Sequence, residues 1–251
     1  MFSKFTKILV CMFMAAMVCA TSLFAQDAKR VYLGVRLGAG SGLTRPLGIL
    51  EEILDVPGAE WKKGGASFDF APFVSLQVVD AFAIQTEMLV TKWGGEYSFH
   101  DDYGFFGGDI KIGFTRRALI IPLLAKFTFH PSIFTIQTFL GPHLTANVGK
   151  WDATYNVFGI SGKEEYDDEE MLEEFFGGDK IYYPPVGVTG GIGFGVKAGP
   201  GNVFVDARFI TDGGVITQDV YYPSLGKKNE NLLYRAKLSF TVGYEFGLGN
   251  R

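Results

Sequence analysis

The sequence predicts an all-β protein, an eight-stranded, up-and-down antiparallel barrel that crosses a membrane. Eight stretches of alternating apolar and polar residues run between Val31 and Leu248. The links between them alternate long and short, and the short ones are Asp80-Ala81, His130-Pro131 and Gly199-Pro200-Gly201. Tight turns at one end and long loops at the other are typical of bacterial outer-membrane barrels, with the short turns periplasmic and the long loops extracellular.

Residues 1–25 have the features of a secretory signal peptide. Lys4 and Lys7 precede an apolar stretch from Ile8 to Phe24, and Ala25 supplies a small residue before the cut. An uncleaved membrane anchor is the alternative, disfavoured because the segment is short. After it, no apolar run approaches the roughly 20 residues of a membrane-spanning helix. A chain that then enters a membrane must close into a barrel, because an open sheet would leave backbone groups unpaired in lipid.

The remaining chain, residues 26–251, is predicted to be one barrel domain. Both cysteines, Cys11 and Cys19, lie in the signal segment, and the sequence around Cys19 is a poor match to a lipid-attachment site. We therefore expect no disulfide, thiolate metal site or cysteine nucleophile. Removing two lysines from 23 basic residues leaves 21 against 27 acidic ones, a formal charge of about −6. This mildly acidic chain has no electrostatic footprint for nucleic acid.

The last strand shows the clearest alternation. Its apolar parity is Leu238, Phe240, Val242, Tyr244, Phe246 and Leu248, and its polar parity is Lys237, Ser239, Thr241, Gly243 and Glu245. Successive side chains of a strand point to opposite faces. In an outer-membrane barrel the apolar face meets lipid and the polar face lines the lumen. The alternative is a soluble lipocalin-like barrel, in which the apolar parity would face a cavity.

The earlier strands repeat this alternation less cleanly. In order they cover Val31–Gly40, Ser67–Val78, Phe82–Trp93, a fourth ending in Ile120–Lys126, Gln137–Asn147, Val186–Ala198 and Val203–Phe209. In the fourth, the alternation reverses before Arg116, which predicts either a β-bulge or a start later than Asp109. The many glycines are interpreted as lumen spacers and strand benders.

Six charged side chains fall on the inward parity, three of each sign. They are Arg36, Glu87, Lys126, Asp206, Arg208 and Glu245. Eight strands leave an interior that side chains just fill, and an isolated buried ion costs several kcal/mol even after relaxation. We therefore predict that these residues form one cross-barrel ion network that closes the lumen. The alternative is a selective ion path lined by the same residues.

Several short motifs together resemble a known family. Ala83–Met88 stands beside Ile121–Phe127, and Leu140–Pro142, Thr189–Gly193 and Val205–Phe209 follow in order. This series resembles the PorT-like outer-membrane β-barrel domain family over nearly all of the mature chain. The resemblance implies a Gram-negative-type outer membrane and, for some members, assistance to protein secretion.

The final strand also resembles the signal that the barrel assembly machinery reads. That signal has a polar residue, a glycine two positions later and two spaced hydrophobic residues, here Thr241, Gly243, Phe246 and Leu248. The chain departs from the commonest pattern because it ends in Gly249-Asn250-Arg251 rather than in an aromatic residue. The partners implied are outer-membrane lipids, the barrel assembly machinery and a surface or periplasmic protein.

The long loops contain three other patterns. Pro46–Val56 has helical apolar spacing, predicting a short amphipathic helix that caps the barrel mouth; the alternative is that it contacts a partner. Lys163–Glu174 is acidic but lacks the ligand spacing of a calcium loop, so we interpret it as a solvated, mobile charge run. The aromatic residues around the second long loop fit either a binding patch or an interfacial aromatic girdle. They are Trp93, Tyr97, Tyr103, Phe105 and Phe106.

No catalytic, metal or cofactor motif emerges. His143 alone of three histidines is placed toward the lumen, and no two histidines have metal-ligand spacing. Both glycine-rich stretches fail as phosphate cradles. We predict a non-enzymatic structural, interaction or secretion-accessory protein with surface-exposed loops. The alternative is a narrow transport pore for ions or small apolar molecules. A lipid-modifying enzyme using His143 is the third reading.

Overall fold

A computed structural model gives the structure of the protein. It describes residues 30–42, 45–46, 59–63, 66–100, 109–131, 133–157, 159–167, 181–182, 186–212, 217–218, 220–222, 227–229, 233–234 and 236–248. The predicted signal peptide, the predicted helix after Pro46 and the aromatic residues 103–106 lie outside these ranges. Within them, no helix is long and apolar enough to span a membrane.

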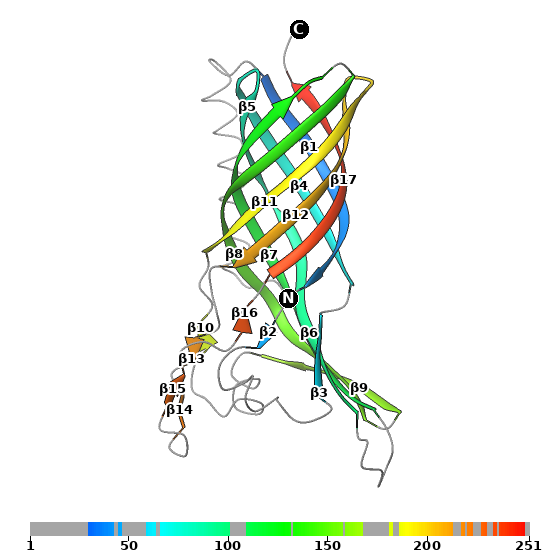
Figure 1. Ribbon diagram of the computed structural model, residues 1–251, viewed down its shortest axis with the longest axis vertical. Coiled ribbons are helices and arrows are strands. Elements are labelled where there is room, and N and C mark those ends of the chain that lie inside the picture. The colour runs from blue at the N-terminus through cyan, green and yellow to red at the C-terminus, as the bar shows by residue number, and fades with distance from the viewer. Residues whose placement is uncertain are drawn as a thin grey trace.

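Eight antiparallel strands close into a barrel (Figure 1). In chain order they are β1 (Arg30–Gly42), β4 (Ala66–Val79), β5 (Phe82–Glu87) continued by β6 (Leu89–His100), β7 (Asp109–Phe129), β8 (Phe134–Val157), β11 (Val186–Ala198), β12 (Gly201–Asp212) and β17 (Ala236–Leu248). β5 and β6 count as one strand because only Met88 interrupts them. β1 pairs with β17 from Val31 opposite Leu248 to Gly42 opposite Lys237, which closes the ring. The predicted fold class is confirmed.

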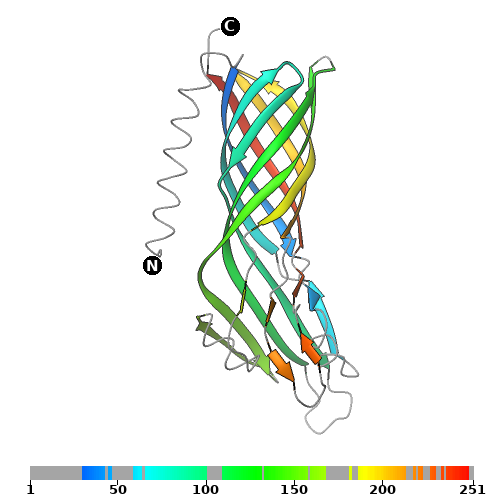
Figure 2. The same ribbon diagram turned by 90° about the vertical axis from the view of Figure 1, so that its left-hand side faces the viewer.

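The short connections all lie at one end of the barrel, here called the short-turn end (Figures 1 and 2). β1 begins and β17 ends there. The Gly199 turn between β11 and β12 needs a left-handed residue, with φ at 61°, a conformation that glycine adopts without strain. β1 and β17 are each 13 residues long, enough for the 9–11 residues that a tilted strand needs to cross a bilayer.

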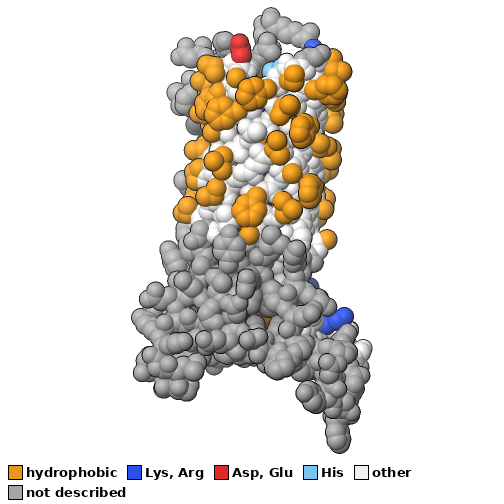
Figure 3. All heavy atoms as spheres, in the orientation of Figure 1, with side chains coloured by type: hydrophobic (Ala, Val, Ile, Leu, Met, Phe, Trp, Pro, Cys, Tyr) orange, Lys and Arg blue, Asp and Glu red, His pale blue; other side chains and the backbone are white. Residues whose placement is uncertain are grey.

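The barrel has its apolar side chains outside and its charges inside. Phe240 and Val242 are 62% and 56% exposed, whereas Lys126 and Arg208 are 4% and 1% exposed. Hydrophobic side chains cover the barrel wall in Figure 3, and the few charged ones in view lie at its ends. This inversion of a soluble core is the arrangement predicted from the strand parity, and a lipocalin-like interior is excluded. It is the arrangement of a barrel whose outer face meets lipid.

The strands on one side continue past the barrel at the long-loop end. There β6, β7 and β8 form an extension with β3 (Ala59–Lys63) and β9 (Ile160–Tyr166), in the order β3-β6-β7-β8-β9 (Figure 1). The register between β7 and β8 shifts between Thr115 and Arg117, which confirms the predicted bulge. The alternative of a late start is wrong, because β7 begins at Asp109. Short strands occupy this end too: β2 (Arg45–Pro46), β10 (Ile181–Tyr182), β13 (Thr217–Gln218), β14 (Val220–Tyr222), β15 (Lys227–Asn229) and β16 (Leu233–Tyr234).

Two sequence interpretations need correction. The first part of the acidic run is not a mobile loop, because Ile160–Tyr166 pairs with β8 from Val157 to Trp151. Gly159, with φ at 86°, makes the turn, and Lys163 Nζ lies 2.9 Å from Asp152 Oδ1. Trp93 belongs to neither a surface patch nor a girdle, because it is 1% exposed and faces the lumen.

Candidate functional site

An ion cluster crosses the middle of the lumen. Glu87, on β5, forms ion pairs with Arg36 from β1 and Arg208 from β12. The distance from Nη1 to the Glu87 carboxylate is 3.1 Å for Arg36 and 2.5 Å for Arg208. Asp206 lies on β12, with its Oδ2 3.5 Å from Arg36 Nε and 3.9 Å from Arg208 Nε. Each of the four residues is at most 3% exposed. Two cations and two anions balance, as charges taken out of water require.

Three phenylalanine rings pack around the guanidinium groups of this cluster. The Cζ of Arg36 lies 4.5 Å from the ring centroid of Phe73, 5.0 Å from that of Phe204 and 5.6 Å from that of Phe139. Arg208 lies 4.7 Å from Phe139. Such cation–π contacts offset part of the cost of burying the charge. The middle of the barrel is therefore filled by aromatic rings as well as by ions.

Glycines on neighbouring strands make room for these rings. A Cβ at Gly34 would lie 2.2 Å from Cζ of Phe73, and one at Gly243 would lie 2.3 Å from Cζ of Phe204. A Cβ at Gly191 would lie 2.5 Å from Cζ of Phe139. The structure therefore gives these inward glycines the spacer role expected from the sequence.

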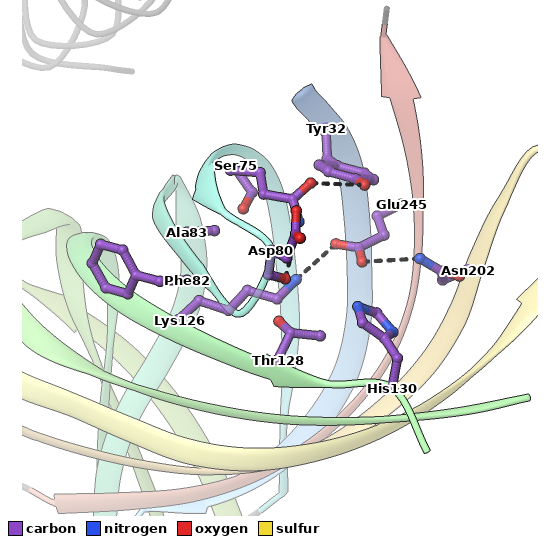
Figure 4. Close-up of a pocket in the computed structure, with 11 residues that line it drawn as sticks. Tyr32, Ser75, Asp80, Phe82, Ala83, Lys126, Thr128, His130, Asn202 and Glu245 are labelled. Carbon is purple, nitrogen blue, oxygen red and sulfur yellow. Dashed lines mark hydrogen bonds and ion pairs between the residues drawn. The ribbon is translucent and has the colours of Figure 1, made fainter. Parts of the chain in front are cut away.

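The other two predicted charges form a separate pair at the short-turn end. Lys126 Nζ lies 2.8 Å from Glu245 Oε2, and Asn202 donates to Glu245 Oε1 at 3.3 Å (Figure 4). Among the described residues, no ion pair or hydrogen bond joins this pair to the central cluster. The six charges therefore form two groups, four residues in the centre and two near the mouth.

Sequence reasoning missed two further polar clusters toward the long-loop end. Lys237 donates to Asp69, Ser67 and Thr91, and Ser239 donates to the same aspartate. His143 lies 2.9 Å from both Thr189 Oγ1 and Asp212 Oδ1. The alternation placed Lys237, Asp69 and His143 on the inward face. It could not pair them, because side-chain parity sets the face but not which residues meet across the lumen.

The arrangement around His143 places a hydroxyl, an imidazole and a carboxylate in a row. Thr189 is 0% exposed and His143 2%, so this row is closed to a substrate in the structure. Thr145 also donates to Asp212, at 3.0 Å, and ties the carboxylate to the lumen wall. Among the described residues, no group of three or more histidine, cysteine or acidic side chains could hold a metal ion.

An apolar cluster fills the lumen beside these polar groups. It consists of Ala71, Leu89, Trp93, Ala118, Ile120 and Ile210, each at most 2% exposed. Trp93, on β6, is the largest fully buried side chain of the described residues. The lumen is therefore packed by rings and aliphatic groups as well as by paired charges.

The four residues of the predicted assembly signal divide between the two faces of β17. Thr241 and Gly243 face inward, where the threonine lies 3.4 Å from Asp206 Oδ2 and the glycine underlies Phe204. Phe246 and Leu248 face outward and are 38% and 44% exposed. Recognition by the assembly machinery stays a prediction.

Comparisons with known proteins identify similar folds only. No family model and no curated protein matches the chain, so the PorT-like resemblance also stays a prediction. A solved structure of the outer-membrane protein OprG of Pseudomonas aeruginosa is 13% identical, covering 90% of this chain and 99% of that one, with a TM-score of 0.45. The outer-membrane protease OmpT of Escherichia coli is 11% identical, covering 88% and 97%, with a TM-score of 0.44. Ail, the attachment invasion locus protein of Yersinia pestis, is 12% identical, covering 86% and 98%, with a TM-score of 0.39. At these values none of them informs the role of this chain.

Proposed function

We propose that the chain is an integral outer-membrane protein with a closed lumen and a non-enzymatic role. The barrel anchors the extension of β3, β6, β7, β8 and β9 at the cell surface, with the short turns in the periplasm. The role is that of a structural or interaction protein, and the PorT-like resemblance favours an accessory to protein export.

The observation that carries this proposal is the filling of the lumen. Four buried charges pair across its centre, three phenylalanine rings surround them, and the Trp93 cluster packs beside them. The interior of an eight-stranded barrel is just wide enough for side chains to fill, whereas barrels of about 16 strands leave an aqueous channel. The extension then carries the surfaces available to a partner.

A narrow transport pore is the second candidate function. It is favoured by inward charged residues at three heights, namely Lys237 with Asp69, the central cluster, and Lys126 with Glu245. An ion would pass from one of these charged groups to the next along the barrel if the side chains between them moved.

Conductance across a planar lipid bilayer tests the two candidates. The purified, refolded protein is expected to give no large steady channels at any applied potential, because paired charges and rings fill the lumen. Large steady conductance that scales with salt concentration would reject the closed lumen in favour of the pore.

A further inference from the structure

A small polar pocket opens at the short-turn end of the barrel (Figure 4). Its cavity measures about 30 Å³ and is lined by polar groups that include Lys126, Glu245, Asn202, Ser75 and Gln77. Since one water molecule needs at least roughly 10–15 Å³ of such volume, the cavity has room for about two. It is too small for an organic ligand, whose pockets start at roughly 300 Å³.

Gln85 is the next lumen-facing residue of β5 after Ala83, which lines the pocket. The cross-strand neighbour of Gln85 is Ser75, which also lines the pocket. Its side chain is 0% exposed, yet neither its amide nitrogen nor its amide oxygen has a hydrogen-bond partner within the described part of the chain. Buried amide groups nearly always have partners, in the protein or in ordered water. An amide that lacks both a donor and an acceptor is the group that water satisfies best, because water is both.

Further donors lie on the two sides of Gln85 along the strand, at Lys126 opposite Ala83 and at Arg36, which pairs with Glu87. The ammonium of Lys126 has three N–H groups, and the described residues supply one acceptor for it, Glu245. Nη2 of Arg36, which is 1% exposed, has no hydrogen-bond partner among the described residues. The lumen between the mouth and the central cluster thus carries more hydrogen-bonding capacity than these residues satisfy.

We propose that water enters the lumen from the short-turn end and is held between the Lys126–Glu245 pair, Gln85 and Arg36. This goes beyond the proposed function but rests on its topology, in which the short turns face the periplasm. We expect the hydrated segment to end at the Trp93 cluster, because its side chains, apart from the indole N–H of Trp93, are apolar and offer no partners to water. The permeability barrier of the barrel is therefore that apolar cluster, and the ion cluster lies on its wet side.

Nuclear magnetic resonance of the refolded protein in micelles tests this with a control inside the molecule. Gln137 is also buried and inward, but its amide nitrogen donates to Asp206 Oδ1 at 2.6 Å. Cross-relaxation with water is expected at the side-chain amide of Gln85 and not at that of Gln137. Equal absence of water contact at both glutamines would overturn the proposal, and so would water contact at the indole N–H of Trp93.

Filling the pocket provides a second test. Ala83→Leu adds volume to the pocket lining and is expected to abolish the water signal at Gln85, while Ala81→Leu in the exposed turn leaves it unchanged. Persistence of the signal in Ala83→Leu would contradict entry by this route. The bilayer conductance separates this inference from the proposed function. Large steady channels would reject only the closed lumen. A barrel that does not conduct and shows no water contact at the Gln85 side-chain amide would reject only this inference.

Discussion

At the scale of single residues, the lumen depends on the fit between glycines and the rings that cover them. Gly34 has the shortest ring contact of the three glycines that lie under rings, and a Cβ there would also lie 2.6 Å from the backbone carbonyl oxygen of Tyr244. A backbone carbonyl cannot move aside as the end of a flexible side chain can. The pair of Gly34 and Phe73 is therefore a fixed part of the barrel interior.

Replacing Gly34 with alanine is expected to lower the free energy of unfolding by about 1–3 kcal/mol, the usual cost of overpacking. The matched control is Gly190→Ala on β11, where the nearest atom is Cδ1 of Leu140 on β8, the end of a flexible side chain, at 3.0 Å. That control should change stability by no more than about 0.5 kcal/mol. Urea unfolding from lipid bilayers measures both, and equal stability of the two variants would contradict the spacer role.

The central charges make a second prediction at this scale. Glu87→Gln leaves Arg36 and Arg208 with Asp206 as their remaining ion partner, and breaking a buried pair in this way costs about 3–5 kcal/mol. Lys163→Gln is the control, because Lys163 pairs with Asp152 at the surface and is 54% exposed, where a pair contributes about 0–1 kcal/mol. The same urea titration compares them. A Glu87→Gln variant as stable as wild type would show that the cluster does not hold the lumen together.

At the scale of strands, parity predicted the face of each residue but not where each strand ends. In the fifth strand the inward parity was assigned only from Gln137 to Asn147, whereas β8 runs on to Val157. Past the barrel, strands pair with one another in the extension, so the alternation between lipid and lumen that marks them in the sequence is lost. The reversal before Arg116 was the one signal that a local change occurs there.

The acidic segment gives a prediction for topology. A protease that cuts after glutamate, added to intact cells, is expected to cleave between Glu169 and Glu174 and to leave the barrel strands protected. Cells broken open before the protease is added serve as the control for total accessibility. Cleavage confined to broken cells would place the long loops in the periplasm and reverse the proposed orientation.

At the scale of the whole molecule, the sequence predicted the closed barrel, its inverted faces and the six buried charges, because each follows from alternation and loop length. It did not predict that Lys126 and Glu245 pair apart from the other four, nor that Phe73, Phe139 and Phe204 meet around Arg36. Those contacts join residues distant in sequence, and they depend on strand tilt and stagger. The position of Trp93 was missed for another reason: it was grouped with the aromatic residues of the following loop, although it has the same parity as the inward Glu87.

The alternation of lipid-facing and lumen-facing residues along β17 is tested most directly by spin labels introduced one at a time from Leu238 to Phe246 in the bilayer-reconstituted protein. Collision with dissolved oxygen, which concentrates in the lipid interior, reports whether each position faces the acyl chains. High oxygen accessibility is expected at 238, 240, 242, 244 and 246 and low accessibility at the positions between them. The reverse order, or accessibility that does not alternate, would contradict the barrel described here.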